Sequence, residues 1–327
     1  MGEINLLLFM DRTWIYSAMS AALLFVGCSE EQPYMQTEEV GPYTVSLVEK
    51  NVWHVEDCNS SNPHGLCRRD DGSISFNGSS DMYIIRGEKK AILIDLSNKI
   101  AWADSAEYAL RSIFNACAGK RDKIITVTHN HGDHTGMYYA FKNESGITFM
   151  LPENDFKADT VFTPDRMLLK DRDCIDLGGM EIECFQCEGH TPGSMIFFLK
   201  GHNLAFSGDA LGSGTGVWLF NKQCFDNFRH GVDRLRAYLE DPASGIDTSS
   251  FRFLTGHTYQ KGEFEIDYRY VRDMQVLNEQ ICSGTAQWEP YNVGFPGLDA
   301  TFKYGNASID WNKAQSEEYA AECVASE

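Results

Sequence analysis

The sequence predicts an α+β fold in which two mixed β-sheets pack face to face and helices cover their outer surfaces. Short apolar segments rich in Val, Ile and aromatic residues outnumber the segments with helical spacing, so strands dominate. The helical segments lie between the strands rather than in one block. One run, residues 123–128 (KIITVT), is continuously apolar and β-branched, which is typical of a buried strand. These patterns together favour an αββα sandwich.

Residues 1–28 are expected to be an export signal rather than part of the fold. Residues 14–27 form an apolar run that is too short for a typical membrane-spanning helix, and a positive charge precedes it. The run ends at Cys28 and polar residues follow, which resembles a bacterial lipoprotein signal. We therefore expect an exported protein of the periplasm or cell envelope with a lipid on Cys28. The alternatives are an uncleaved membrane anchor and a start at Met10 instead of Met1.

The elements that follow are predicted from local patterns. Residues 29–42 are polar and are expected to tether one domain, residues 43–311, which a C-terminal tail follows at residues 312–327. Apolar residues recur at helical spacing in residues 101–118, 225–240 and 263–283. Short β-branched or alternating runs predict strands at residues 43–48, 51–55, 81–86, 90–95, 123–128, 147–151, 181–187, 194–199, 203–207, 251–254, 301–304 and 307–311. The strands at residues 81–86 and 90–95 are close enough in the chain to form a hairpin.

The net charge of the chain narrows the classes of molecule that it can bind. The formal net charge is -19, which argues against binding of nucleic acid because that requires clustered Lys and Arg. We therefore expect a small-molecule substrate.

Cys58 and Cys67, among ten cysteines, flank a short polar loop and can pair in an oxidising compartment.

The segment most informative about function is residues 128–136 (THNHGDHTG). Three His and one Asp lie within six residues of it, although the whole chain has only nine His. Burying so many imidazoles after an apolar strand would be costly without partners, and a metal ion provides them. His129 and His131 alternate on an extended segment and point the same way, Gly132 is expected to allow a turn, and Asp133 and His134 then face a second point. One loop can therefore supply ligands to two metals.

This H-x-H-x-D-H pattern resembles the signature of the metallo-β-lactamase superfamily. Four further motifs follow the same family order, each at a strand end: Asp95 at the end of KAILID, His190 in GHTPGS, Asp209 in SGD and His257 in TGH. The resemblance spans residues 43–284. It implies that the αββα sandwich is of the metallo-β-lactamase type.

The resemblance also implies an assignment of ligands to two divalent metal ions. Site 1 would be held by three imidazoles and site 2 by Asp133 with two imidazoles, while Asp209 would bridge the ions and Asp95 would support the ligands from behind. The site 1 ligands would be His129, His131 and His190, and the imidazoles of site 2 would be His134 and His257. A bridging hydroxide would be the nucleophile, and Asp133 would move a proton to the leaving group. Zn is the default metal, while Fe or Mn can occupy related sites.

The nature of the bridging residue favours some substrates over others. Zinc β-lactamases carry Cys or Ser where Asp209 stands, so the motif set is more similar to glyoxalase II and lactonase enzymes. We therefore expect a metal-dependent hydrolase acting on an ester, lactone, thioester or related bond, with a β-lactam hydrolase, a phosphodiesterase or a non-catalytic binding protein as alternatives. Residues 211–220 are Gly-rich and end in an apolar cluster, in which Trp218 and Phe220 either line the substrate pocket or pack in the core.

Overall fold

The structure is a computed structural model that describes residues 32–57, 79–101, 103–213, 215–260, 264–291 and 295–326. The predicted leader with Cys28 and the loop with Cys58 and Cys67 lie outside these ranges, so export, lipidation and the disulfide stay predictions. Among the described residues, no helix combines the length and apolarity that crossing a membrane requires.

The largest sheet has eight strands in chain order. Its first five strands run antiparallel to their neighbours, and β5 through β8 are parallel, so the sheet is mixed. Its strands are β1 (Glu38–Val40), β2 (Tyr43–Glu49), β3 (Val52–Asp57), β4 (Asp81–Arg86), β5 (Lys90–Ile94), β6 (Asp122–Thr126), β7 (Ile147–Pro152) and β8 (Met167–Leu169).

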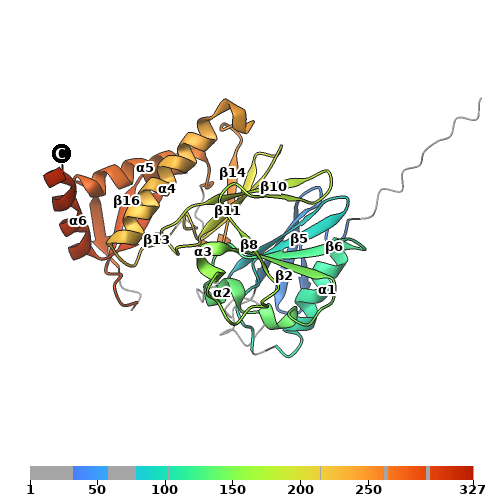
Figure 1. The fold of residues 1–327 in the computed structure, drawn as a ribbon. Helices are drawn as coiled ribbons and strands as arrows, with labels where there is room; N and C mark the ends of the chain where they lie inside the picture. The colour runs from blue at the N-terminus through green and yellow to red at the C-terminus, as the bar shows by residue number, and fades with distance from the viewer. Residues whose placement is uncertain are drawn as a thin grey trace, which may run out of the picture. The chain divides into compact units, whose positions relative to one another are not determined.

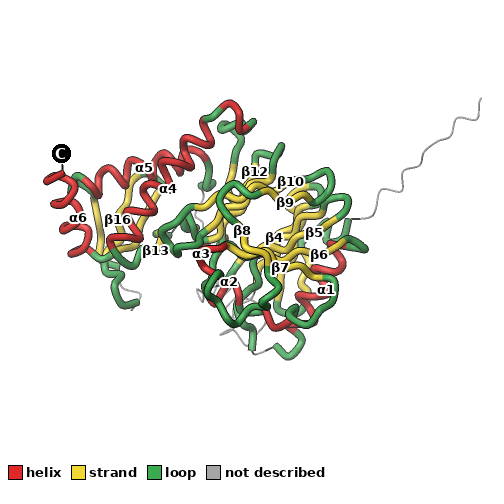
Figure 2. Tube along the Cα trace, viewed as in Figure 1, coloured by secondary structure: helices red, strands yellow, loops and turns green. Residues whose placement is uncertain are grey.

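A second mixed sheet of five strands has the order β14-β12-β11-β10-β9. All its neighbouring strands are antiparallel except β12 and β14, which are parallel. The strands are β9 (Cys174–Asp176), β10 (Glu181–Gln186), β11 (Met195–Leu199), β12 (Leu204–Gly208) and β14 (Arg252–Thr255). Figure 2 shows the two sheets lying over one another.

Alternation of side chains along the strands builds the two inner layers of the core. On β4, Ile85 faces the second sheet, where it belongs to the same cluster as Phe197 of β11, whereas the neighbouring Ile84 belongs to the cluster that packs against α1 (Ala106–Ala118). Because successive side chains in a strand point to opposite faces, these fully buried strands are apolar at every position. The predicted αββα layering is confirmed on this side of the molecule.

The C-terminal part of the chain adds a third, four-stranded sheet with the order β13-β17-β16-β15. Its strands are β13 (Val217–Trp218), β15 (Gln287–Pro290), β16 (Ala300–Tyr304) and β17 (Ala307–Trp311). Helices α4 (Lys222–Glu240) and α5 (Tyr268–Cys282) pack between this sheet and the outer face of the second one, in a cluster that includes Phe228 and Phe198 (Figure 1). The short elements that remain are α2 (Gly132–Thr135), α3 (Glu153–Phe156) and the 3-10 turns Tyr138–Ala140, Pro242–Ser244 and Thr258–Gln260.

Two expectations about the ends of the domain need correction. Part of the expected tether is the edge strand β1, which pairs with β2. This pairing provides hydrogen-bond partners for backbone N–H and C=O groups of both strands. The expected tail is a helix, α6 (Lys313–Ser326), whose Tyr319 and Ala320 are buried against the C-terminal core. Only a few of its side chains are apolar, so its helical period was weak in the sequence.

Candidate metal centre

The loop with the His-x-His motif begins after β6 and continues into the single turn of α2. His131 has an extended backbone (φ −67°, ψ 151°) directly before that turn, so His129 and His131 project from an extended segment while His134 projects from a helical one. The turn begins at Gly132 as predicted, but it does not require glycine. The φ of Gly132 lies outside the left-handed region and a Cβ would meet nothing within 4 Å, so another residue could stand there.

Three imidazoles form a first group in which one ring nitrogen from each lies within 4.8 Å of the others: His129, His131 and His190. The Nε2 atom of His190 is 2.9 Å from Nδ1 of His131. The other nitrogen of His190, Nδ1, is 3.1 Å from the Trp218 carbonyl oxygen and must donate to it, because a carbonyl can only accept. The nitrogen that faces the group is therefore the one with a free lone pair.

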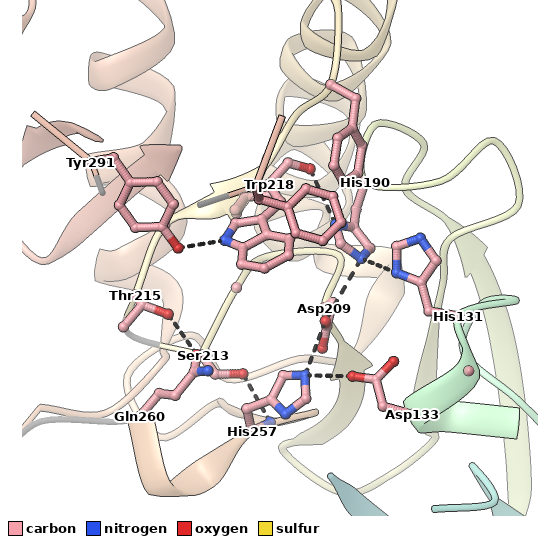
Figure 3. Close-up of a pocket in the computed structure, with 16 residues that line it drawn as sticks. His131, Asp133, His190, Asp209, Ser213, Thr215, Trp218, His257, Gln260 and Tyr291 are labelled. Atoms are coloured by element: carbon pink, nitrogen blue, oxygen red, sulfur yellow. Dashed lines mark hydrogen bonds and ion pairs between the residues drawn. The ribbon is translucent and has the colours of Figure 1, made fainter. Parts of the chain in front are cut away.

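A second group lies beside the first and contains Asp133, His134, Asp209 and His257. Asp209 is its centre, with Oδ1 3.4 Å from His134 Nε2 and Oδ2 3.2 Å from His257 Nε2. The same Oδ2 is 3.7 Å from Nε2 of His190, which belongs to the first group. Figure 3 shows Asp209 between His190 and His257, the position that a bridging carboxylate would require.

The two groups differ in their electrostatics. Burial lowers the pKa of His129 and His131 and lowers the pKa of His190 to about 4, so the first group consists of neutral imidazoles. Burial opposes charge on His257 as well, but the carboxylates of Asp209 and Asp133 outweigh it and raise the pKa to about 9. The first group can thus bind a metal ion through neutral nitrogen lone pairs, whereas the second group also contributes negative charge.

Unsatisfied buried atoms support a metal at this place. His129 Nε2, His134 Nε2 and Asp209 Oδ1 are buried and have no hydrogen-bond partner among the residues that the structure describes. Buried polar atoms are nearly always satisfied, so three together at one point require an explanation. Imidazole nitrogens with a carboxylate form the mixed donor set that Zn, Fe and related divalent ions prefer. The residues present therefore fit two metal ions.

Asp95 lies behind the second group, as the motif predicted. It follows β5 with a left-handed backbone (φ 67°) and is buried. Its Oδ2 is 3.0 Å from Nδ1 of His134, and its Oδ1 accepts from the backbone N–H of Thr128 at 2.6 Å. The carboxylate thus fixes the ring of His134 and the start of the His-rich loop at once.

A third segment orients His257 and was not recognised in the sequence. Nδ1 of His257 lies 2.6 Å from the Ser79 carbonyl oxygen. Asp81, the first residue of β4, accepts from the backbone N–H of Thr258 at 2.5 Å and lies 2.6 Å from Nε2 of His54. These residues belong to no motif, and only the pairing of the two chain segments in space brings them to the site.

A pocket of about 320 Å³ opens over the metal-ligating side chains. Trp218 and Phe220 line it, so the prediction that they form a pocket wall is favoured over packing in the core. Tyr291 and Phe295, from the segment after α5, complete an aromatic wall, and the rings of Trp218 and Phe295 are 4.9 Å apart. Figure 3 shows Trp218 between Tyr291 and His190. Neither Tyr291 nor Phe295 could be recognised from the sequence, because they belong to no motif.

The comparisons with known proteins agree with this arrangement. The sequence model of a family described as the metallo-beta-lactamase superfamily matches residues 76–242, just over half of the chain. Among solved structures, a metallo-beta-lactamase from Pontibacter korlensis superposes with a TM-score of 0.51, at 16% identity, over 75% of this chain and 99% of that one. At this identity the likeness concerns the fold alone.

Curated relatives match over shorter segments. The hydroxyacylglutathione hydrolase of Anaeromyxobacter dehalogenans is 31% identical over 44% of this chain and 51% of its own length. The hydroxyacylglutathione hydrolase GloC of Haemophilus influenzae is 29% identical over 28% of this chain and 51% of its own length. The human persulfide dioxygenase ETHE1 is 38% identical over 20% of this chain and 26% of its own length. The chain thus spans about half or less of the length of these relatives.

Proposed function

This chain belongs to the metallo-β-lactamase superfamily, and we propose that it is a metal-dependent hydrolase that cleaves an ester, lactone or thioester carrying an apolar group. The observation that carries the proposal is the contact of the two ligand groups through Asp209, which lies 3.2 Å from His257 and 3.7 Å from His190. This is the arrangement that a binuclear site needs. The hydrolase names of several relatives agree with it.

The chain would bind one ion through His129, His131 and His190 and a second through Asp133, His134 and His257, with Asp209 shared. When bound, two divalent ions would supply a hydroxide nucleophile near neutral pH and would polarise the oxygen of the scissile carbonyl. Asp133 is the only one of these side chains that is both acidic and substantially exposed to the pocket, at 31%. Its carboxylate can accept the proton of the nucleophile and pass it to the departing alkoxide or thiolate.

The aromatic wall of the pocket supports the apolar part of the proposed substrate. Trp218, Phe220 and Phe295 form one continuous cluster, with the ring of Phe220 5.9 Å from that of Phe295. Phe220 also packs 6.2 Å from the ring of His190, so an apolar group against the wall would place an adjoining carbonyl over the ligand groups. A thioester is included because two of the relatives just described are named for an acyl group on glutathione.

The test begins with the metal content of the purified full-length chain. Elemental analysis is expected to find about two Zn, Fe or Mn ions per chain and fewer in His131→Ala. The matched control is His230→Ala, which removes an exposed imidazole on α4 outside the pocket and should keep both ions. A His131→Ala variant with the full metal content would contradict the ligand assignment.

Substrates then separate the classes of reaction. We would measure hydrolysis of phenylacetyl and acetyl thioesters, an acyl lactone, hydroxyacylglutathione and a chromogenic β-lactam by the same preparation. Turnover of the phenylacetyl thioester or the lactone, lost at least 100-fold in His131→Ala, is the expected result. Preference for the β-lactam would reject the proposed substrate class. Oxygen uptake with a persulfide, in the absence of any hydrolysis, would reject a hydrolase altogether.

A further inference from the structure

The aromatic wall is held from behind by a buried acid on the third sheet. Asp310 of β17 is fully buried and pairs in register with Trp218 of β13, and its carbonyl oxygen accepts from the backbone N–H of Leu219 at 3.0 Å. Gly216, just before β13, lies so close that a Cβ there would overlap the carboxyl group of Asp310. The segment that lines the pocket therefore packs directly on this carboxyl group.

A chain of hydrogen bonds leads from the pocket to that acid. The indole N–H of Trp218 donates to the hydroxyl oxygen of Tyr291 at 3.0 Å, and the indole has no lone pair to offer in return. The hydroxyl group of Tyr291 and the indole N–H of Trp218 both lie within hydrogen-bonding range of the carboxylate of Asp310, which can only accept. The hydroxyl group of Thr301, on β16, donates to Oδ1 of Asp310 at 2.5 Å and fixes the acid in place. The side chains of Thr301, Tyr291 and Trp218 therefore converge on one buried carboxylate.

From this geometry we propose that Asp310 is a positioning residue that sets the selectivity of the pocket for substrates with a large apolar group. It acts on the substrate only through Tyr291 and Trp218, and it lies outside the ligand groups. The proposal rests on the proposed function, because it concerns the substrate side of the same pocket. Loss of the carboxylate removes an acceptor shared by Tyr291 and Trp218, and the ring of Trp218 is then less firmly held in the wall.

The ionisation of Asp310 is compatible with this role. Burial raises the pKa of its carboxyl group to about 6, although hydrogen bonds from Thr301, Tyr291 and Trp218 act in the opposite direction. The second oxygen, Oδ2, has no hydrogen-bond partner among the described residues, which agrees with the raised pKa. At pH 7.5 the group is still ionised, so it can accept the proton of Tyr291.

The experiment compares Asp310→Leu, which has nearly the same size but no acceptor, with Tyr291→Phe and the double variant at pH 7.5 in metal-loaded, full-length protein. The matched control is Glu289→Gln, which removes one negative charge from an exposed position of the same sheet. Steady-state kinetics with phenylacetyl and acetyl thioesters give KM and kcat for a large and a small acyl group. Binding of 4-phenylbutanamide, an uncharged amide, is followed through the fluorescence of Trp218, taken as the difference from Trp218→Phe.

Each single variant is expected to raise KM for the phenylacetyl substrate and the Kd of the amide about fivefold, the effect of one net hydrogen bond. The acetyl substrate and kcat should change less than twofold. The double variant should be no worse than either single variant, because both substitutions break the same chain of bonds. Additive effects, or equal losses with both substrates, would overturn the proposal.

Two further controls keep the result interpretable. If Asp310→Leu does not fold, Tyr291→Phe still tests the proposal, because Tyr291 is only partly buried and its ring is retained. If neither the thioesters nor the lactone are turned over, the proposed function fails, but the amide titration still decides whether Asp310 holds the aromatic wall in place. Unchanged amide affinity in both single variants would reject the role of Asp310 whatever the catalytic activity.

Discussion

Replacing Asp95 by Asn tests whether the second ligand group is organised from behind. Asn is nearly the same size and tolerates the left-handed backbone at this position (φ 67°). The amide can still accept from the backbone N–H of Thr128 through its oxygen, which is 2.6 Å away in the wild type. Its NH2 group, however, would face Nδ1 of His134, now 3.0 Å from the carboxylate, so two donors would meet.

The size of the effect follows from that clash. A buried donor that loses its partner costs about 1–3 kcal/mol, and removal of a carboxylate that orients a ligating His weakens metal binding about 10–100-fold. At about 1.4 kcal/mol for each factor of ten, a 10–100-fold loss of metal affinity corresponds to about 1.4–2.8 kcal/mol. This agrees with the cost of the unpaired donor. We expect Asp95→Asn to lower the affinity of the second group for its metal ion about 10–100-fold. It should also lower Tm by a few degrees.

The assay is competition for Zn with a chromogenic chelator at pH 7.5, which resolves a tight and a weak site. The matched control is Asp104→Asn, an exposed acid just before α1, which should leave both affinities unchanged. Unchanged affinity at both sites in Asp95→Asn would refute the reasoning. A smaller loss at the first site is expected, because Asp95 also binds Thr128 Oγ1, which lies 3.1 Å from Nδ1 of His129. A loss confined to the first site would refute the reasoning as well.

Three further predictions concern packing, metal removal and pH. Gly256→Ala should abolish metal binding by the second group, because a Cβ there would overlap an Asp209 oxygen and lie 2.8 Å from Cε1 of His134, whereas Gly132→Ala should keep both ions. Chelation with EDTA should lower Tm, measured by calorimetry, and added Zn should restore it. The raised pKa of Asp310, about 6 against a usual 3.8, means that the native state binds this proton more tightly than the unfolded state. The free energy of unfolding of the wild type, relative to Asp310→Asn, should therefore fall by up to about 3 kcal/mol as the pH in urea titrations rises from about 4 to 6.5.

The parts of the fold that local patterns specify were predicted well. The strand pairs at residues 81–86 and 90–95 form the expected hairpin of β4 and β5, because alternation and short connections are local signals. By contrast, β13 has two residues and exists only through pairing with β17, which lies about ninety residues later in the chain. A two-residue strand has no period, so nothing in its own sequence could reveal it.

The same distinction applies to the site. The seven predicted ligands come together because each stands in a motif at a strand end, where backbone geometry and residue type are fixed within a few positions. That they bind metal stays a prediction. Ser79 and Asp81 orient His257 and its loop through tertiary contacts, and Tyr291 meets Trp218 only because the segment after α5 folds over the pocket. Contacts of that kind depend on how sheets are placed, which local sequence does not encode.

The two sides of the pocket therefore have separate physical origins, and this predicts separable effects of mutation. The ligand groups are fixed by strand ends of the sandwich and by buried acids such as Asp95, so changes there should act on metal affinity and kcat. Within the aromatic wall, Trp218 lies on β13 of the third sheet, and among the described residues no other strand of that sheet lines the pocket. The carbonyl oxygen of Trp218 on that strand also accepts a hydrogen bond from Nδ1 of His190, so the strand contacts both sides of the pocket.

A side-chain change such as Trp218→Phe keeps this carbonyl and should alter substrate preference alone. A change that displaces the strand itself, such as Gly216→Val against the carboxyl group of Asp310, should release His190 as well and lower metal affinity at the first group.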